Sequence, residues 1–529
     1  MDGPTTTVRE AALEFLRAQG MTTVFGNPGS TELPMLTDFP DDFHYVLGLQ
    51  EASVVGMADG YAQATGRPAL VNLHTAPGLG NALGALVNAS ANGSPLVVTA
   101  GQQVRPMINL EAMLTDVRAV ELPQPLVKFS AEPARAQDVP ALLARATHLA
   151  MTPPRGPVFV SIPMDDWGAP ASDEATGLVT ARRVHGRTGP DPAALDDVVD
   201  ALAGARSPAL VIGGDVDATG GFDDAVALAE RLAAPVFAPP GSGRAGFPWT
   251  HPLYQGSLPS AIAPVADALE PYDVVLVVGA PVFRYYPYVP GRFLPAGTRL
   301  LHVTASPDEA ARAPMGDALL ADPALFLRAL IGRVPAAHRE VPARRAPEAP
   351  AARDDGVLTA DEVFAAVAEL WPRDGVLVDE SPSNLAAAQD RVPLARPGSF
   401  YFTASGGLGF GLPAAVGVAL ADPSRPVLAA IGDGSMQYSI QALATAATLA
   451  VPVTVLVLDN REYAILKWFA RRENTPKAPG LDLPPIDHVG LAAAYGVPGE
   501  TASTRDELRA ALSRGFAGPG PRLVHVPLR

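Results

Sequence analysis

The stretch PVLAAIGDGSMQYSI at residues 426–440 combines a strand pattern with an abrupt end, and the fold can be inferred outward from it. Its apolar run indicates a buried strand that stops at Asp433, an acid flanked by two glycines. Glycines let the backbone approach a ligand closely, and we expect Gly434 and Ser435 to open a helix over residues 435–450 whose free N–H groups attract an anion. An acid at this point suits a hard cation such as Mg²⁺ held against phosphate oxygens.

A second oxygen ligand is expected at the end of the next strand. The apolar run VPVTVLVLDN at residues 451–460 ends on Asn460. One β-α-β unit would bring the carboxyl ends of both strands side by side, which makes Asn460 the candidate ligand. The alternative is a Gly-Asp-Gly turn whose Asp only caps a helix, and an isolated motif favours that interpretation.

The rest of the chain repeats the same alternation of short apolar strands and Ala/Leu-rich helices. Examples of the strands are PALVNLH, PALVIGG, DVVLVVGAP and GVLVDE. Fully apolar strands between helices indicate parallel sheets covered on both faces. We therefore predict an α/β protein with three doubly wound parallel-sheet domains, over residues 1–170, 190–335 and 357–529, joined by Pro/Ala-rich linkers at 165–197 and 334–356. A capping box at Thr359 and Glu362 should open the last domain with a helix.

Composition narrows the class of protein. The 529 residues carry a formal net charge of −16 and only three lysines, which argues against a nucleic-acid surface and favours small-molecule partners. Cysteine is absent, which excludes disulfides and thiolate metal sites. No apolar run approaches the roughly 20 residues that span a bilayer. The start MDGPTTTVREAALEF lacks a basic segment followed by an apolar one, so we expect a cytoplasmic protein.

Several common catalytic signatures are missing from the sequence. It holds no P-loop, no G-x-S-x-G elbow, no H-E-x-x-H and no well-placed G-x-G-x-x-G. These gaps remove the simplest interpretations as a P-loop NTPase, an α/β-hydrolase, a zincin or an NAD enzyme. Ligands of doubly wound sheets bind beyond the carboxyl ends of the strands, which directs attention to residues 26–30, Glu51, His74, Glu380 and Asp433.

Asp433, a helix, an apolar strand and Asn460 together resemble the motif that binds thiamine diphosphate. Chemistry on that cofactor needs a carboxylate in a dry pocket to hydrogen-bond the pyrimidine ring, and Glu51 is the candidate because it follows an apolar strand and precedes a small-residue helix. Taken alone, a Glu at a helix start is more often a surface acid favoured by the helix dipole.

Long segments extend the resemblance over nearly the whole chain. They include VFGNPGSTELP, LGLQEASVVGMADGYAQATG, VNLHTAPGLGNALG, TAGQQVRPM, GAPVFRYYPY, EAARAPMGDA, GGLGFGLPAAVGV and IGDGSMQYS. The chain resembles the thiamine diphosphate-dependent decarboxylases and is most similar to the benzoylformate decarboxylase group. The resemblance implies a pyrimidine-binding first domain, a middle domain without catalytic residues, a diphosphate-binding last domain, and a homotetramer with active sites at subunit interfaces.

The resemblance also implies roles for individual residues. Glu51 matches the glutamate that activates the cofactor, Asp433 and Asn460 match the metal ligands, and Glu462 matches the residue whose backbone carbonyl completes the Mg²⁺ or Ca²⁺ site. Leu408 matches the apolar residue that holds the cofactor bent, although it could equally be a core leucine. Further matches to cofactor contacts are Ser383, Gly406, Gly434, Ser435 and Tyr463.

Residues facing the substrate follow from the same comparison. Ser30 matches the residue that contacts the substrate carboxylate, with a helix N-cap as the alternative, and His74 matches a catalytic histidine, with a structural role as the alternative. An aryl group would suit a wall formed by Met113, Leu114, Ile465 and Phe469, each of which could also be core.

One position departs from the pattern. Tyr286 stands where the benzoylformate decarboxylases have a second catalytic histidine, and a phenol does not relay protons at neutral pH as imidazole does. The expected function is non-oxidative decarboxylation of an aromatic 2-oxo acid by a lyase. Two alternatives stay open: a carboligase or lyase of the same cofactor class, and a non-catalytic subunit with the same fold.

Overall fold

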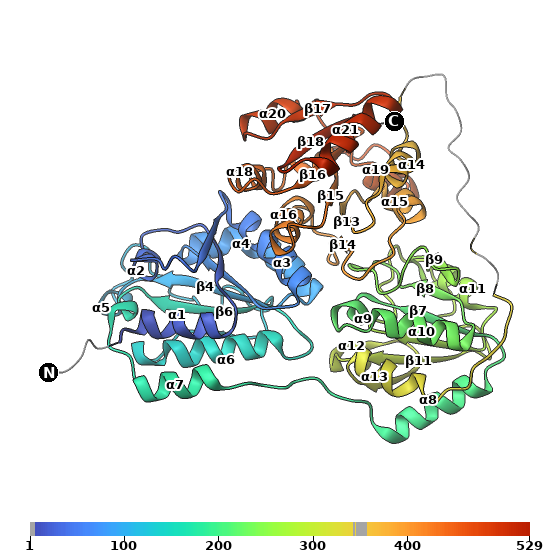
Figure 1. Ribbon diagram of the computed structural model, residues 1–529, viewed down its shortest axis with the longest axis horizontal. Helices are drawn as coiled ribbons and strands as arrows, with labels where there is room; N and C mark the ends of the chain where they lie inside the picture. The colour runs from blue at the N-terminus through green and yellow to red at the C-terminus, as the bar shows by residue number, and fades with distance from the viewer. Residues whose placement is uncertain (1–5, 342–343, 345–356, 529) are drawn as a thin grey trace. The chain divides into compact units, whose positions relative to one another are not determined.

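The computed structural model describes residues 6–341, 344 and 357–528 of the chain (Figure 1). It contains three sheets of six strands each, and the strand pairs described in them are parallel. Helices alternate with the strands along the chain, as parallel connections require. The predicted fold class of three doubly wound parallel-sheet domains is confirmed.

The first sheet has the strand order β2-β1-β3-β4-β6-β5. Its strands are β1 Thr23–Gly26, β2 His44–Leu47, β3 Ala69–Leu73, β4 Leu96–Gln102, β5 Ser130–Ala131 and β6 Val158–Pro163. The helices of this part are α1 Val8–Ala18, α2 Leu33–Leu36, α3 Glu51–Thr65, α4 Thr75–Asn92, α5 Arg105–Ile108, α6 Val139–Met151 and α7 Asp173–Ala181, with 3-10 turns η1 Ala136–Asp138 and η2 Asp166–Gly168. Figure 1 shows α1 and α6 on one face of the sheet and α3 and α4 on the other, which explains why the strands are apolar on both faces.

The second sheet has the order β12-β11-β10-β7-β8-β9. Its strands are β7 Pro208–Ile212, β8 Val236–Ala238, β9 Tyr254–Ser257, β10 Val274–Val278, β11 Arg299–Thr304 and β12 Asp317–Leu320. The accompanying helices are α8 Pro192–Gly204, α9 Gly214–Ala218, α10 Phe222–Leu232, α11 Ile262–Leu269, α12 Pro307–Arg312 and α13 Pro323–Ile331.

The third sheet has the order β14-β13-β15-β16-β18-β17. Its strands are β13 Val376–Glu380, β14 Phe400–Phe402, β15 Val427–Gly432, β16 Val453–Asp459, β17 Gly499–Thr501 and β18 Arg522–Pro527. The helices are α14 Ala360–Leu370, α15 Leu385–Arg391, α16 Gly411–Ala421, α17 Asp433–Met436, α18 Ala442–Thr448, α19 Ala464–Arg472, α20 His488–Ala494 and α21 Arg505–Ala517. The predicted capping box of Thr359 and Glu362 is present at the start of α14.

The chain divides into two compact units. The first comprises Met1–Gly186, Val378–Ser383 and Thr403–Arg529, and the second comprises Arg187–Leu377 and Asn384–Phe402. The three domain ranges given above stay a prediction. The linker expected at 165–197 is wrong in part, because it contains α7, which packs against α1 and α6. Much of the second predicted linker lies outside the described residues.

Helices α3 and α16 form the most extensive helix contact of the first unit, and glycine makes it possible. A Cβ atom on Gly60 would lie 2.2 Å from the backbone oxygen of Ala414, and one on Gly417 would lie 1.9 Å from that of Met57. Neither position has room for even a methyl group, because the opposing atoms are backbone and cannot rotate away. We call this contact between α3 and α16 the glycine seam.

The single helix predicted over residues 435–450 is wrong. The structure has the short α17, a series of turns, and then α18. Hydrogen bonds in the turns run three residues back, as from the Tyr438 N–H to Ser435 and from the Leu443 N–H to Ile440, so the α-helical pattern is not continued. The intervening Tyr438, Ser439 and Ile440 are poorer helix formers than the alanines that follow.

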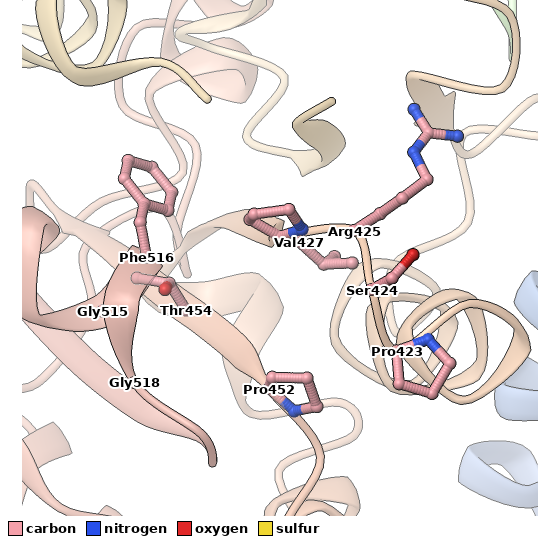
Figure 2. A pocket seen from close by; sticks show the side chains of 10 residues that line it. Pro423, Ser424, Arg425, Val427, Pro452, Thr454, Gly515, Phe516 and Gly518 are labelled. Atoms are coloured by element: carbon pink, nitrogen blue, oxygen red, sulfur yellow. The ribbon is translucent and has the colours of Figure 1, made fainter. Parts of the chain in front are cut away.

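A pocket lies at the amino ends of β15 and β16 (Figure 2). Its lining includes Arg425, Val427, Thr454 and Phe516. Parallel sheets bind ligands at the carboxyl ends of their strands, so this pocket is at the opposite end of the sheet from the predicted site residues.

Among the described residues, no helix is both long and apolar enough to cross a membrane.

Candidate active site

Strand order explains why the predicted site residues gather where they do. The first sheet reverses its direction of winding between β1 and β3, and the third sheet does so between β13 and β15. Loops leaving such neighbouring strands turn to opposite faces and leave a crevice at the carboxyl edge. Ser30 and His74 follow β1 and β3, and Ser383 and Asp433 follow β13 and β15.

Asp433 and Asp459 form a pair of buried carboxylates at the carboxyl ends of β15 and β16. Their residues are 5% and 6% exposed, and the Arg461 N–H donates to both of them, at 3.0 and 3.1 Å. Burial, and then the neighbouring Asp459, raise the pKa of Asp433. Although burial alone would raise it, the hydrogen bond from His525 at 2.9 Å lowers the pKa of Asp459. Two carboxylates beside one histidine leave an excess of negative charge that a divalent cation would balance.

Asn460 directly follows Asp459. Strand β16 pairs with β15 in parallel, so the carboxyl ends of the two strands are neighbours, as predicted. The Asn460 side-chain oxygen accepts the Glu462 N–H at 3.1 Å, which leaves it a second lone pair for a cation. The Glu462 carboxylate is engaged by Lys467, so only its backbone carbonyl is offered to a ligand. These oxygen donors are of the kind that Mg²⁺ and Ca²⁺ prefer.

Glu51 is the first residue of α3 and is 9% exposed. Its two carboxylate oxygens accept the side-chain amides of Asn27 at 3.2 Å and Asn81 at 3.1 Å. The two amides keep the carboxylate in place, while each oxygen retains a lone pair for a further donor. Gly78 leaves space beside the Glu51 side chain, since a Cβ atom there would lie 3.5 Å from its oxygen. Glu51 is therefore a buried acid held by two amides, and not the exposed acid at a helix start that was the alternative interpretation.

His74 follows β3 and caps no helix with its side chain. Its Nδ1 atom lies 2.9 Å from the buried Glu32 carboxylate and 3.2 Å from the Thr31 hydroxyl. A carboxylate oxygen only accepts, so Nδ1 carries a proton and Nε2 is the nitrogen left for a ligand. The imidazole is therefore fixed in orientation by its neighbours.

Glu32 also organises the loop that carries Ser30. One of its oxygens accepts the Gly29 N–H at 2.8 Å, and the other accepts the Gly101 N–H at 2.8 Å and the Thr31 hydroxyl at 2.7 Å. Ser30 itself is exposed, and the N-cap of α2 is Glu32 rather than Ser30. The helix-capping alternative for Ser30 is therefore wrong, and its hydroxyl is left at the surface beside His74's loop.

The remaining predicted cofactor contacts surround the ends of β13 and β15. The Ser383 hydroxyl accepts the Ile465 N–H at 3.0 Å, which ties the turn after β13 to α19. Tyr463 lies over Gly434, where a Cβ atom would meet its ring at 2.6 Å, and Ser435 is buried in α17. Leu408 is half-buried in the loop before α16, between two positive-φ glycines, Gly406 and Gly409.

The side chains of the predicted substrate wall and of Tyr286 are exposed or half-buried. Met113 is 86% exposed, and Leu114, Ile465 and Phe469 are half-buried. Tyr286 is 67% exposed and belongs to the second compact unit, whereas the other predicted site residues belong to the first. Its N–H donates to the Ser260 carbonyl at 2.6 Å. These assignments stay predictions.

Comparisons with known proteins identify the family. Residues 6–122 match the model of the thiamine pyrophosphate enzyme N-terminal TPP binding domain, residues 195–330 match the central domain, and residues 383–526 match the C-terminal TPP binding domain. The chain is 52% identical to benzoylformate decarboxylase from Pseudomonas aeruginosa over 522 residues, or 98% of each chain. The chain belongs to the thiamine pyrophosphate enzyme family.

Two solved structures of thiamine pyrophosphate enzymes are also similar over nearly the full length. One is the thiamine diphosphate-dependent 4-hydroxybenzoylformate decarboxylase of Rhodococcus jostii RHA1, with a TM-score of 0.97, 47% identity and 99% of both chains covered. The other is benzoylformate decarboxylase from Polynucleobacter necessarius, with a TM-score of 0.95, 43% identity, and 99% of this chain and 98% of that chain covered.

Membership of the thiamine pyrophosphate enzymes is consistent with the residues present. The cofactor needs a cation at its diphosphate, and Asp433 with Asp459 supplies uncompensated negative charge at the predicted place. It also needs a buried carboxylate for its pyrimidine ring, and Glu51 is one. Thiamine diphosphate is the cofactor of this protein.

Sequence reasoning missed the partners of these groups. Glu32, Asn81 and Asp459 were not singled out, and Asn27 and Glu380 were marked only as strand-end positions. Asp459 could have been found, because it precedes Asn460 at the end of the same apolar run. Glu32 and Asn81 carry no such signal. Glu32 is the N-cap of α2 and Asn81 lies inside α4, and each reaches its partner only through the fold.

Proposed function

We propose that this protein removes CO2 from an aromatic 2-oxo acid of the benzoylformate type and releases the aldehyde. The observation that carries the proposal is the 52% identity over 98% of each chain to a benzoylformate decarboxylase. The Rhodococcus relative, named for 4-hydroxybenzoylformate, supports the same class of substrate. The oriented His74 and the buried Glu51 are what this chemistry requires.

Thiamine diphosphate, when bound, supplies a carbon nucleophile and accepts the electron pair that CO2 leaves behind. The Glu51 carboxylate, held by Asn27 and Asn81, would hydrogen-bond the pyrimidine ring through an oxygen. Asp433, Asn460 and the Glu462 carbonyl would hold Mg²⁺, or Ca²⁺, at the diphosphate. Ser383, Gly406, Gly434, Ser435 and Tyr463 would contact the cofactor, with Leu408 holding it bent.

Ser30 and His74 would act on the substrate. The Ser30 hydroxyl would donate to the substrate carboxylate and hold it for departure as CO2. In its imidazolium form, His74 would give the Nε2 proton to the oxygen of the reacting carbonyl, while Nδ1 keeps its own proton against Glu32. Acid–base assistance of this kind is typically worth about 10²–10⁴ in rate.

The test is an assay of purified protein with thiamine diphosphate and Mg²⁺. Aldehyde formation would be measured from benzoylformate, 4-hydroxybenzoylformate, pyruvate and a branched-chain 2-oxo acid. We expect the aromatic acids to be the preferred substrates, and Glu51→Gln to abolish turnover, whereas the exposed Glu14→Gln leaves it unchanged. Full activity of Glu51→Gln, or a preference for aliphatic acids, would contradict the proposal.

Tyr286 favours a second reaction, ligation to another aldehyde. A phenol is a poorer proton relay than the histidine expected at this position. Protonation of the species left after CO2 departs should therefore be slower, and that species should persist long enough to react with a second aldehyde. We infer that the protein joins two aldehydes more readily than relatives with histidine. The measurement is the ratio of ligation product to free aldehyde in wild type and Tyr286→His; an unchanged ratio would rule out this role.

We also propose a homotetramer with active sites between subunits. Exposed apolar side chains in the segment after β4 support an interface there: Leu110 is 70% exposed, Met113 86% and Val117 61%. Side chains of this kind are ordinarily covered in an assembled protein. Sedimentation of the purified protein would give its mass, and a monomer with full activity would contradict the proposal. A cytoplasmic location stays a prediction.

A further inference from the structure

The loop Thr403–Gly411 connects β14 to α16 and carries Leu408. Gly406 has φ +77° and Gly409 has φ +100°, so the backbone on both sides of Leu408 is in a conformation that other residues rarely adopt. The direction of the Leu408 side chain therefore depends on what holds this backbone. Two buried side chains outside the loop do so.

Glu380 holds the loop on the side of α16. It is the last residue of β13 and is 1% exposed. One carboxylate oxygen accepts the Gly409 N–H at 2.6 Å, and the other accepts the Gly411 N–H at the start of α16. The residue at the N-cap of α16, Phe410, has no side chain that can do this, so Glu380 caps the helix from another element.

Asn88 holds the loop on the side of α4. It is 3% exposed, its oxygen accepts the hydroxyls of Thr403, at 2.9 Å, and of Ser405, and its amide donates to the Gly407 carbonyl at 3.2 Å. Asn88 therefore makes three hydrogen bonds to the loop. Asn92, one turn further along α4, accepts the Ala404 N–H at 3.2 Å.

We propose that Glu380 and Asn88 are positioning residues that fix the loop Thr403–Gly411 and thereby set where Leu408 meets the cofactor. The inference rests on the proposed function, because the role of Leu408 does. Glu380 also links two predicted cofactor contacts, since the turn after β13 that begins with it carries Ser383 and its carboxylate holds the loop of Leu408. The sequence of the loop alone gives no sign that Glu380 connects the Ser383 turn to the Leu408 loop.

The experiment replaces Glu380 by Gln and Asn88 by Ala in the full chain. The Gln side chain has one accepting oxygen and one donating amide, so one of the two N–H groups of the loop would face another donor and be pushed away. A misplacement of about 1 Å can cost about 10²-fold in rate. We expect kcat at saturating thiamine diphosphate and Mg²⁺ to fall about 10²-fold in Glu380→Gln, with a weaker apparent Kd for thiamine diphosphate.

Two measurements separate positioning from simple loss of stability. Near-ultraviolet circular dichroism of the bound cofactor should change in Glu380→Gln and Asn88→Ala, and kcat should stay low when the cofactor is saturating. Asp322→Asn is the matched control, because Asp322 is also a buried carboxylate that caps a helix, at α13 in the second unit. It should lower the unfolding temperature and leave the cofactor signal and kcat unchanged.

The outcomes distinguish this inference from the proposed function. If Glu380→Gln only lowers the unfolding temperature, with the Kd, the dichroism and kcat of the wild type, the positioning role is wrong while the proposed function stands. If Glu51→Gln decarboxylates as well as the wild type, the proposed function fails and this inference fails with it. A changed cofactor signal with reduced kcat in both loop variants supports the inference.

Discussion

His74 acquires its chemical role from Glu32, a residue that touches no expected ligand. The buried carboxylate fixes the proton on Nδ1 and, through the Gly29 N–H, also fixes the backbone next to Ser30. One side chain therefore sets the direction of the two groups proposed to face the substrate. Its position as the N-cap of the short helix α2 gives no hint of this in the sequence.

Replacement of Glu32 by Gln should therefore reduce kcat by about 10²-fold, within the range of acid–base assistance. The reason is that His74 loses the carboxylate that holds its Nδ1 proton and orients its ring. Steady-state kinetics at saturating thiamine diphosphate and Mg²⁺ would check this, and a kcat equal to that of the wild type would contradict it.

Asp59 in α3 gives a second prediction at the scale of one residue. It is fully buried, and burial raises its pKa to about 6 against hydrogen bonds from Ser94, Gln63 and Asn92. A raised pKa in the folded state means that the folded protein binds a proton that the unfolded chain has released. The stability contributed by this proton is complete below the ordinary value of 3.8 and is lost as the pH rises through about 6.

Asp59→Asn removes this titration. The free energy of unfolding of the wild type should fall between pH 4.5 and 7 by up to a few kcal/mol from this residue, since one pKa unit corresponds to about 1.4 kcal/mol. The variant should have a lower free energy of unfolding than the wild type, because three donors lose a charged acceptor. Its free energy of unfolding should, however, fall less over the same pH range. Urea unfolding of the apoprotein at several pH values measures both, and parallel curves would refute the assignment.

At the scale of elements, the glycine seam determines how α3 and α16 meet. Gly60→Ala or Gly417→Ala would place a methyl group against a backbone oxygen. Overpacking of this kind lowers the free energy of unfolding by about 1–3 kcal/mol, and by more where the backbone must move. Gly84→Ala in α4 is the matched control: its Cβ atom would meet nothing within 4 Å, and it should stabilise by about 0.5–1 kcal/mol. Thermal unfolding of the three variants compares them, and equal effects would contradict the seam.

Element prediction from the sequence succeeded where local chemistry and tertiary structure agree. The box at Thr359 and Glu362 opened α14 as expected, and the apolar runs ending at Asp433 and Asn460 became neighbouring strands. The helix expected over 435–450 failed because its middle is held in turns by hydrogen bonds that run three residues back, over residues that are poorer helix formers than alanine. The helix α7 was missed because its Pro- and Gly-rich surroundings read as a linker.

At the scale of the whole molecule, cofactor binding should be visible as stability. A ligand that binds only the folded state stabilises by about 2.7 kcal/mol at 100 times its Kd. Thiamine diphosphate with Mg²⁺ should therefore raise the unfolding temperature of the wild type. Asp433→Ala should abolish this increase, and it should itself raise the unfolding temperature of the apoprotein by relieving repulsion from Asp459. Scanning calorimetry with and without cofactor measures both effects.

The two outcomes of that measurement test different statements. If Asp433→Ala still gains stability from cofactor and Mg²⁺, Asp433 is not the metal ligand. If the apoprotein of Asp433→Ala is less stable than the wild type, the two carboxylates do not repel each other in the apoprotein. The exposed Asp482→Ala serves as the control for loss of one acid from the same region.

The candidate site could be predicted from the sequence only as far as strand ends reveal it. His74 and Asp433 follow β3 and β15, which flank the winding reversals of their sheets, and Glu51 and Asn460 follow β2 and β16, each one strand away from a reversal. Tyr286 and Met113 are exposed and do not directly follow a strand, so strand ends did not reveal them. Partners such as Glu32 and Asn88 act across long separations in the sequence that no local pattern encodes.

The glycine seam has a consequence for efforts to evolve new substrates. Every substitution at Gly60 or Gly417 adds atoms where backbone already stands, so random mutagenesis there yields only losses. The segments that carry exposed or half-buried apolar side chains, after β4 and in α19, have no such restriction. A mutant library for altered substrate specificity should vary residues in those two segments and leave α3 and α16 unchanged.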